Sequence, residues 1–494
     1  MIELAKNNSA SKKDGVFYTN YLLAEFMIEK MNIDYKSSFR LLEPAVGEGH
    51  ILLNIVQRIL DFNSEKDDSF IKEKMQESIV GFDKRKEAIE ICKKSLNELI
   101  KDNRGKDLKI EWNIFELDIL EYQNKKIVGD FDYVICNPPY ISKRNLSKEK
   151  RIILEKKSNY CNKYSYDLYY YFIESSLEYW NGFGKMVFVT PNSYLRARSA
   201  NSLRKDIFRK RQVEEIFDFD HNKLFSDALT YSAVTVFSSN NTNLRLIKMD
   251  DKFKELESKR IEYNRIDRLP EYQIYQINYI EDKIEGIPLK EIAYISNGLA
   301  TLADSVFFLK KSETTKDVFL DKDNNEINIE HKILRKTVRA SNLDETYYLI
   351  FPYTQNKEKG VLEVMKLSEN YFPLTYQYLT NNLKPQYKEK YGLGFGRTQG
   401  LKHYLEEKII VPKVATPNTK FRSGEFGYIR AGLYIVMNEG YSDITESVLE
   451  YLNSDDVNRY LNEVSKNYSA GYKSISSRDL KEILIPMNIL RRNR

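Results

Sequence analysis

The stretch FDYVICNPPY, residues 131–140, decides the fold. Its first six residues are mostly apolar, aromatic or β-branched, a composition that predicts a buried strand. The next four, Asn137-Pro138-Pro139-Tyr140, end that strand in a turn, which is rigid because each proline fixes its own φ. A buried strand with a polar motif at its carboxyl end is typical of parallel α/β sheets, where ligands bind outside the strand ends.

Similar strands occur on both sides of this stretch. Helical segments separate them, such as HILLNIVQRIL (50–60), in which apolar residues recur every three or four positions. This alternation predicts an α/β, Rossmann-like domain whose mainly parallel, seven-stranded sheet is covered by helices on both faces. The other six predicted strands are SFRLLE (38–43), SIVGFD (78–83), FELDIL (115–120), GKMVFVT (184–190), FDFD (217–220) and SAVTVFS (232–238).

Residues that could bind a ligand lie at the ends of three more strands. Glu43 opens the turn EPAVGEG (43–49), in which Ala45 and Gly47 would let a ligand approach the backbone closely. Asp83 could accept hydrogen bonds from ribose hydroxyls, and Asp118 could accept one from an amino group. An aspartate taken singly in such a position is more often a helix N-cap or a loop acid than a ligand contact.

The motif at 137–140 suits chemistry on an aromatic amino group. The lone pair of such a nitrogen is delocalised into the ring, and two acceptors aimed at the amino hydrogens would draw it back. The Asn137 side-chain oxygen and the Pro138 carbonyl could supply them, held in place by the rigid turn. Tyr140 would offer a ring face on which an extruded base could stack. The alternative is an ordinary loop, which the position at a strand end disfavours.

Two short segments are strongly basic, although the net charge of the chain is only +5. Residues 141–163 carry eight basic and two acidic side chains, and residues 195–212 carry seven and one. Either segment could be a solvated helix face. Because both follow segments placed at the ligand-binding edge, we favour contact with phosphates.

Other features exclude some classes of protein. The cysteines, Cys92, Cys136 and Cys161, fit neither a zinc site nor a disulfide framework, and Cys136 is expected to pack in the core. No apolar run is long enough to span a membrane, and the first residues lack the apolar core of a signal peptide. We therefore expect a cytoplasmic protein with no metal and no membrane partner.

The 494 residues indicate more than one domain. Residues 1–245 are predicted to form the α/β domain and the polar segment 246–285 to connect it to a second domain. Residues 286–494 lose the alternation of strands and helices and contain turn clusters such as YGLGFGRTQG (391–400). We expect them to form a mixed α/β domain.

In sequence order, the strand ends carry a glycine turn, two acids and Asn-Pro-Pro-Tyr. This order resembles the amino-methylating DNA methyltransferases of the gamma motif order, the TaqI methylase group. The resemblance covers residues 11–240 well and 286–494 more loosely. It implies an adenine-specific, site-specific DNA methyltransferase that uses S-adenosyl-L-methionine, flips its target adenine out of double-stranded DNA and methylates N6. It also implies that residues 286–494 recognise the target sequence.

The resemblance gives each site residue a role. Tyr18 and Thr19 would lie against the cofactor, with Glu43, Ala45 and Gly47 on its methionine side, Asp83 at its ribose and Asp118 at its adenine amino group. Asn137, Pro138, Pro139 and Tyr140 would be catalytic. Phe225 would stack on the flipped base opposite Tyr140, although it could also be a core aromatic, and Lys143 and Arg144 would contact DNA. The family usually has a large apolar residue where this chain has His50, which we expect to start a helix.

Several other functions remain open. N4-cytosine DNA methylation is the closest, and similar motifs occur in methyltransferases that act on RNA or on protein glutamine. A DNA-binding specificity subunit with a decayed methylase fold is a non-enzymatic alternative. Some relatives carry a nuclease before the methylase, but only about fourteen residues precede the first motif here. We therefore expect the modification enzyme of a restriction–modification system, with a cognate restriction endonuclease as a possible partner.

Overall fold

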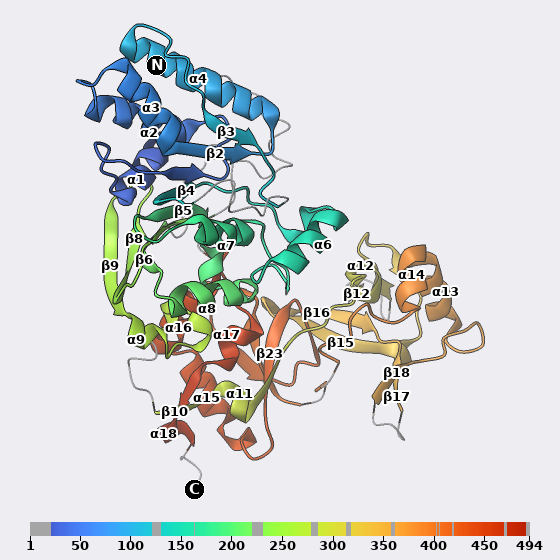
Figure 1. Cartoon of the computed structure of the whole chain (residues 1–494). Coiled ribbons are helices and arrows are strands. Elements are labelled where there is room, and N and C mark those ends of the chain that lie inside the picture. Colours follow the sequence, from blue (N-terminus) through green and yellow to red (C-terminus); the bar gives the residue numbers. More distant parts are fainter. Residues whose placement is uncertain are drawn as a thin grey trace. The chain divides into compact units, whose positions relative to one another are not determined.

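The structure, a computed structural model, divides into two compact units, Met1–Ile277 and Asn278–Arg494. Figure 1 shows both, coloured along the sequence. No helix in the described part of the chain is long and apolar enough to cross a membrane. The residues described are 21–120, 130–162, 164–219, 231–277, 285–312, 318–356, 361–401, 403–404, 406–416, 419–468 and 472–490.

One mixed sheet is the framework of the first unit. Its nine described strands lie in the order β3-β2-β1-β4-β5-β7-β6-β8-β9. The pairs from β3 to β5 are parallel, and β7 is antiparallel to both β5 and β6. The carboxyl ends of β1 to β5 therefore lie at one edge. The strands are β1 (Leu41–Glu43), β2 (Ile79–Asp83), β3 (Asn113–Glu116), β4 (Tyr133–Cys136), β5 (Met186–Pro191), β6 (Val213–Asp218), β7 (Ser232–Phe237), β8 (Asn243–Met249) and β9 (Glu255–Glu262).

The sheet has two strands more than the sequence predicts. Strand β9 lies within the segment 246–285 that was expected to connect the domains, and β8 begins just before that segment. Strand β8 buries Leu244, Ile247 and Met249, but β9 is an edge strand whose residues are mostly exposed. An edge strand with charged side chains avoids pairing with other chains, which explains its polar sequence. The boundary between the two units accordingly falls at residue 277 and not at 245.

Helices cover both faces of this sheet. One buried cluster joins the sheet to α1, α2 and α4, and another joins it to α7 and α8. The polar residues 62–78 contain helix α3, which Asp67 caps by accepting from the Phe70 backbone N–H. The longer helices of this unit are α1 (Tyr21–Met31), α2 (His50–Phe62), α3 (Asp68–Ser78), α4 (Lys86–Arg104), α6 (Lys148–Lys157), α7 (Tyr169–Tyr179) and α8 (Asn201–Arg209).

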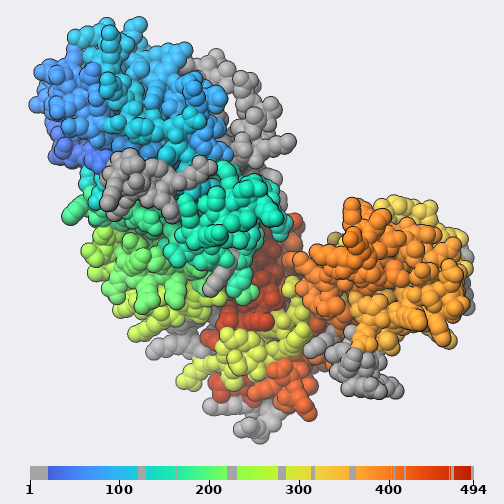
Figure 2. All heavy atoms as spheres, turned by 45° about the vertical axis from the view of Figure 1, so that its right-hand side comes forward, coloured from blue at the N-terminus to red at the C-terminus, as the bar shows by residue number. Residues whose placement is uncertain are grey.

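The second unit is mixed α/β, as the sequence predicts. A four-stranded sheet has the order β11-β23-β19-β21, and a six-stranded sheet has the order β14-β13-β12-β16-β15-β22. In the space-filling view, yellow and orange residues gather in one lobe (Figure 2). The main strands are β11 (Ala293–Asn297), β12 (Phe308–Lys311), β15 (Leu334–Arg339), β16 (Asn342–Ile350), β19 (Lys408–Pro412), β22 (Tyr428–Arg430) and β23 (Gly432–Met437), and the helices include α12 (Asp304–Phe307), α13 (Pro373–Asn382), α14 (Pro385–Tyr391), α15 (Thr445–Leu452) and α16 (Asp455–Val464).

Candidate active site

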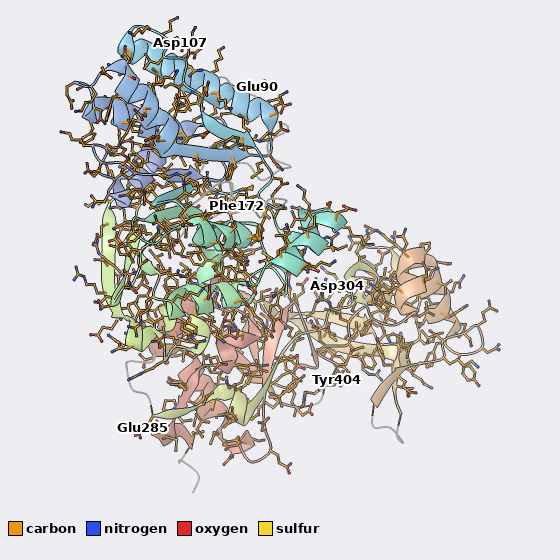
Figure 3. The ribbon with its side chains drawn as sticks, viewed as in Figure 1. Glu90, Asp107, Phe172, Glu285, Asp304 and Tyr404 are labelled. Atoms are coloured by element: carbon orange, nitrogen blue, oxygen red, sulfur yellow. The ribbon has the colours of Figure 1, made fainter. Side chains whose placement is uncertain are left out.

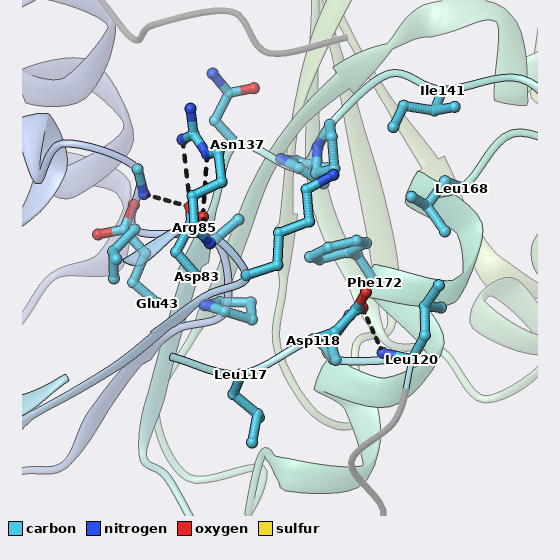
Figure 4. A pocket seen from close by; sticks show the side chains of 18 of the residues that line it. Glu43, Asp83, Arg85, Leu117, Asp118, Leu120, Asn137, Ile141, Leu168 and Phe172 are labelled. Atoms are coloured by element: carbon cyan, nitrogen blue, oxygen red, sulfur yellow. Dashed lines mark hydrogen bonds and ion pairs between the residues drawn. The ribbon is translucent and has the colours of Figure 1, made fainter. Parts of the chain in front are cut away.

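A cavity of about 260 Å³ lies at the carboxyl ends of β1 to β4 (Figure 4). Parallel pairing brings these ends to one edge, so residues far apart in sequence share one wall. The start of α6 and the side chains of Leu168 and Phe172 complete the cavity. Eight residues predicted from the sequence line it: Glu43, Ala45, Gly47, Asp83, Asp118, Asn137, Pro138 and Pro139.

The glycine turn after β1 brings backbone to the cavity wall. Gly47 has φ 54° and Gly49 has φ 89°, conformations that side chains disfavour. A Cβ on Gly49 would lie 2.5 Å from the Cys92 sulfur, so the turn also packs tightly against α4. Helix α2 begins at His50, as predicted, and burial lowers the pKa of that histidine.

Two acidic side chains, Glu43 and Asp83, lie near the turn. Glu43 is 2% exposed, and its Oε2 has no hydrogen-bond partner among the described residues. Burial raises the pKa of Glu43 well above its usual value, and the charge of Asp83 raises it further. Asp83 accepts hydrogen bonds from the Gly47 N–H at 2.9 Å and from the Arg85 N–H at 2.9 Å. The wall therefore holds a buried carboxyl that a cationic ligand would favour as carboxylate.

Arg85 is a site residue that the sequence did not reveal. Its Nε lies 3.2 Å from Asp83 Oδ1, and the side chain lines the cavity. The only sequence signal is its position two residues after the acid, which is too common to be informative.

Asp118 is held in place by the segment that follows and by helix α6. Its Oδ1 accepts from the Leu120 N–H at 3.0 Å, and its Oδ2 lies 2.7 Å from the Lys150 Nζ. Lys157 donates to the Leu120 carbonyl at 2.9 Å, which ties a second point of α6 to the same segment. One lysine of the basic segment 141–163 thus belongs to the cavity wall.

The Asn-Pro-Pro-Tyr turn places Asn137 at the cavity and Tyr140 behind it. The Tyr140 hydroxyl lies 2.9 Å from the Asn137 Oδ1 and 3.2 Å from the Val189 carbonyl, and it can donate to either. Burial raises the pKa of Tyr140 well above its usual value, so the hydroxyl keeps its proton at neutral pH. The ring packs edge-on against Tyr169 with centroids 6.4 Å apart. Tyr140 therefore orients the asparagine; that it also stacks on a base stays a prediction.

Comparisons with known proteins find similar sequences among restriction-modification methylases. Residues 68–225 match the family model described as Eco57I restriction-modification methylase. The chain carries an Eco57I-type restriction-modification methylase domain. It is 26% identical to the Type II methyltransferase M.HincII of Haemophilus influenzae, over 66% of this chain and 68% of that protein.

A second relative of this methylase domain is the Type II restriction enzyme and methyltransferase RM.Eco57I of Escherichia coli. It is 21% identical over 63% of this chain, and the match covers 32% of RM.Eco57I. Among solved structures, the Type IIL restriction-modification enzyme MmeI in complex with DNA aligns with a TM-score of 0.60 at 12% identity, over 93% of this chain and 63% of that one. The chain thus spans about a third to two thirds of these proteins.

The cavity of the methylase domain fits S-adenosyl-L-methionine, its cofactor. The buried Glu43 carboxylate would face a ligand that carries a sulfonium and an ammonium. Its Oε2, which has no partner in the described part of the chain, can accept a hydrogen bond. Leu117, Leu168 and Phe172 supply apolar surface for an aromatic ring (Figure 4). Leu168 and Phe172 were not predicted, because their place in the wall depends on how α7 packs.

The remaining predicted residues of the methylase domain divide into three groups. Lys143 pairs with Glu155 at 2.7 Å, whereas the neighbouring Arg144 is exposed. Cys136 is fully buried, as predicted for a packing residue, and no metal-binding cluster occurs among the residues that the structure describes. Tyr18, Thr19 and Phe225 lie outside the described residues.

Proposed function

We propose that this chain methylates the N6 amino group of an adenine at a specific site in double-stranded DNA. The observation that supports this most directly is the shared cavity. Asn137 and Pro138, the two proposed acceptors for an amino group, line the same cavity as Glu43, Asp83 and Asp118, the proposed cofactor contacts. One cavity could therefore hold the methyl donor and the target nitrogen together.

Asn137 acts on the target nitrogen in this proposal. Its side-chain oxygen and the Pro138 carbonyl accept the two amino hydrogens, which localises the nitrogen lone pair for attack. An amide oxygen has two lone pairs, so Asn137 can accept from Tyr140 and from the substrate at once. A hydrogen bond donated by the Tyr140 hydroxyl would hold this oxygen in one orientation.

The cofactor, when bound, supplies the methyl group as an electrophile. Glu43 would lie on the methionine side of the cavity, Asp83 would accept from ribose hydroxyls, and Asp118 would accept from the adenine amino group. All three are fixed by their neighbours or by burial, so little ordering is needed when the ligand enters.

DNA must present the target base outside the helix, because N6 cannot be reached for chemistry within the duplex. Tyr140 and Phe225 are proposed to stack on the extruded base, and Lys143 and Arg144 to contact phosphates. The Lys143–Glu155 ion pair leaves the exposed Arg144 as the stronger candidate. Residues 286–494 are proposed to recognise the sequence, and a cognate restriction endonuclease would act on the same site.

Methylation-aware sequencing tests the proposal. Genomic DNA from cells that express the chain should carry N6-methyladenine at one short motif, and Asn137→Ala should abolish the signal while S-adenosyl-L-methionine still binds. N4-methylcytosine at a motif would instead support the cytosine alternative. Unmethylated DNA from cells that contain folded, cofactor-binding protein would refute the proposal and direct attention to RNA or protein glutamine.

Base extrusion has its own test. A duplex with 2-aminopurine at the target adenine should change fluorescence when the protein binds, and Tyr140→Ala should bind with a brighter signal and methylate slowly. A mismatch opposite the target should strengthen binding, because less pairing energy is lost. Unchanged fluorescence together with no mismatch preference would contradict extrusion.

A further inference from the structure

Two distant segments of the second unit lie against each other. The first, GLATLADSVFFL (298–309), leads through α12 into β12, and the second, GRTQG (396–400), follows α14. The Gly396 N–H donates to the Thr301 carbonyl at 2.8 Å. The rings of Phe307 and Phe395 meet edge to face, with centroids 4.9 Å apart. Figure 3 labels Asp304, at the end of the first of these loops.

The second loop is anchored at both ends. Phe395 is 5% exposed, and its N–H donates to the Tyr353 hydroxyl at 2.7 Å. Leu401 is 6% exposed, and its carbonyl accepts from the Tyr428 hydroxyl at 3.1 Å. The three residues between Gly396 and Gly400 therefore protrude from a fixed frame.

Neither glycine of this frame has room for a side chain. A Cβ on Gly396 would lie 2.7 Å from Leu302, and a Cβ on Gly400 would lie 2.9 Å from the backbone of Gly298. Gly400 also has φ 77°, which favours glycine.

Arg397, Thr398 and Gln399 are all exposed. Arginine can donate two hydrogen bonds to guanine O6 and N7, and glutamine can pair with adenine N6 and N7. A phosphate-binding surface usually gathers several cations. This loop instead presents one cation and two neutral hydrogen-bonding side chains, a set that suits the edges of bases.

Leu302 lies next to Gly396, the residue before these three, and has an unusual backbone conformation. It is 52% exposed and has φ 60°, a region that costs an L-residue energy. The loop is held in part by the Thr301 side chain, which accepts from the Ala303 N–H at 3.1 Å and bonds to the Asp304 carboxylate at 2.5 Å. A strained, exposed leucine contributes little to folding, and such strain commonly marks a functional position.

We propose that Leu302 and Arg397–Gln399 together form a base-reading element that contacts base edges in the major groove of DNA. This inference rests on the proposed function and names the part of residues 286–494 that carries out recognition. Arg397 donates to base edges, Gln399 donates to or accepts from them, and Leu302 packs against an apolar group such as a thymine methyl.

Methylation-aware sequencing of wild type and variants tests this assignment. Arg397→Ala should weaken discrimination at one position of the methylated motif by about 5- to 150-fold, the range for one bidentate base contact. Binding to a random-sequence duplex should change little, and its salt dependence should keep its slope. The control is Arg459→Ala, which removes an exposed arginine that pairs with Asp456 on α16 of the same unit. Its motif should match that of the wild type.

Leu302→Gly provides a second test, which distinguishes a role of Leu302 in base reading from a role in stability alone. Glycine tolerates positive φ, so the variant should melt no lower than the wild type. It should still lose discrimination next to the position read by Arg397.

Three results would overturn the assignment. If Arg397→Ala and Leu302→Gly both methylate the wild-type motif, these residues do not read bases. A uniform loss of DNA affinity in Arg397→Ala, with the salt slope reduced by about one, would make Arg397 a phosphate contact. If the wild type methylates no DNA, the proposed function fails and the reading element fails with it, whereas a wild-type motif that both variants retain refutes the reading element alone.

Discussion

Replacing Glu43 with glutamine tests whether this buried carboxyl recognises the positive charge of the methyl donor. The change removes the charge and keeps the size of the side chain. Glu43 is 2% exposed, and its Oε2 has no partner among the described residues. A hydrogen bond to a charged group contributes ~1.5–3 kcal/mol. We therefore expect the Kd for S-adenosyl-L-methionine to rise roughly 10- to 150-fold.

The same carboxyl should make both protein stability and cofactor affinity depend on pH, in opposite directions. The pKa of Glu43 is raised above 4.5 in the folded protein, mainly by burial, so the folded state holds a proton that the unfolded chain releases. Without ligand, the stability of the wild type should therefore fall as the pH rises from 4.5 towards the folded pKa. Over the same window cofactor affinity should rise, because the cation favours the ionised carboxylate. Glu43→Gln should flatten both dependences.

Isothermal titration calorimetry across this pH range measures the affinity, and thermal melting monitored by circular dichroism measures the stability. Glu90→Gln is the matched control, because its side chain is exposed on α4 away from the cavity wall. If Glu43→Gln binds the cofactor as tightly as the wild type does, and with the same pH dependence, the Glu43 charge does not recognise the cofactor.

Three further changes test other parts of the wall. Asp83→Asn should weaken cofactor binding by ~1.5–3 kcal/mol if its charge meets the ribose, and calorimetry that shows no change would place the ribose elsewhere. Tyr140→Phe should lower kcat by roughly 3- to 10-fold, because a neutral hydrogen bond to Asn137 is worth about 1 kcal/mol, while the cofactor Kd stays constant. Lys150→Met should change the free energy of unfolding in denaturant by less than about 1 kcal/mol, because its ion pair with Asp118 is partly exposed; a larger loss would show that the pair is structural.

The meeting of these residues at one cavity could be predicted because each of them follows its own strand. Glu43, Asp83 and Asn137 each come at or directly after the end of an apolar strand, and parallel pairing then brings the ends together. The prediction needed only local patterns and a general property of parallel sheets. The roles that the resemblance gives these residues stay predictions.

Residues that depend on the packing of helices could not be predicted in the same way. Lys150 belongs to a run of lysines and arginines, and only the placement of α6 separates it from its neighbours. Phe172 reaches the cavity because α7 is buried against the sheet. The polar strand β9 was missed for a related reason: an edge strand exposed to solvent need not show an apolar pattern.

The loop around Arg397–Gln399 assigns packing and recognition to different residues, although in many proteins the same residues must serve both. Phe395, Leu401 and the two flanking glycines carry the packing, while the three exposed side chains carry almost none of it. Substitutions at these three positions should therefore cost the folded protein little stability. A chain built in this way could acquire new target sequences by changing only the tip of one loop, which makes the triplet a starting point for engineering altered specificity.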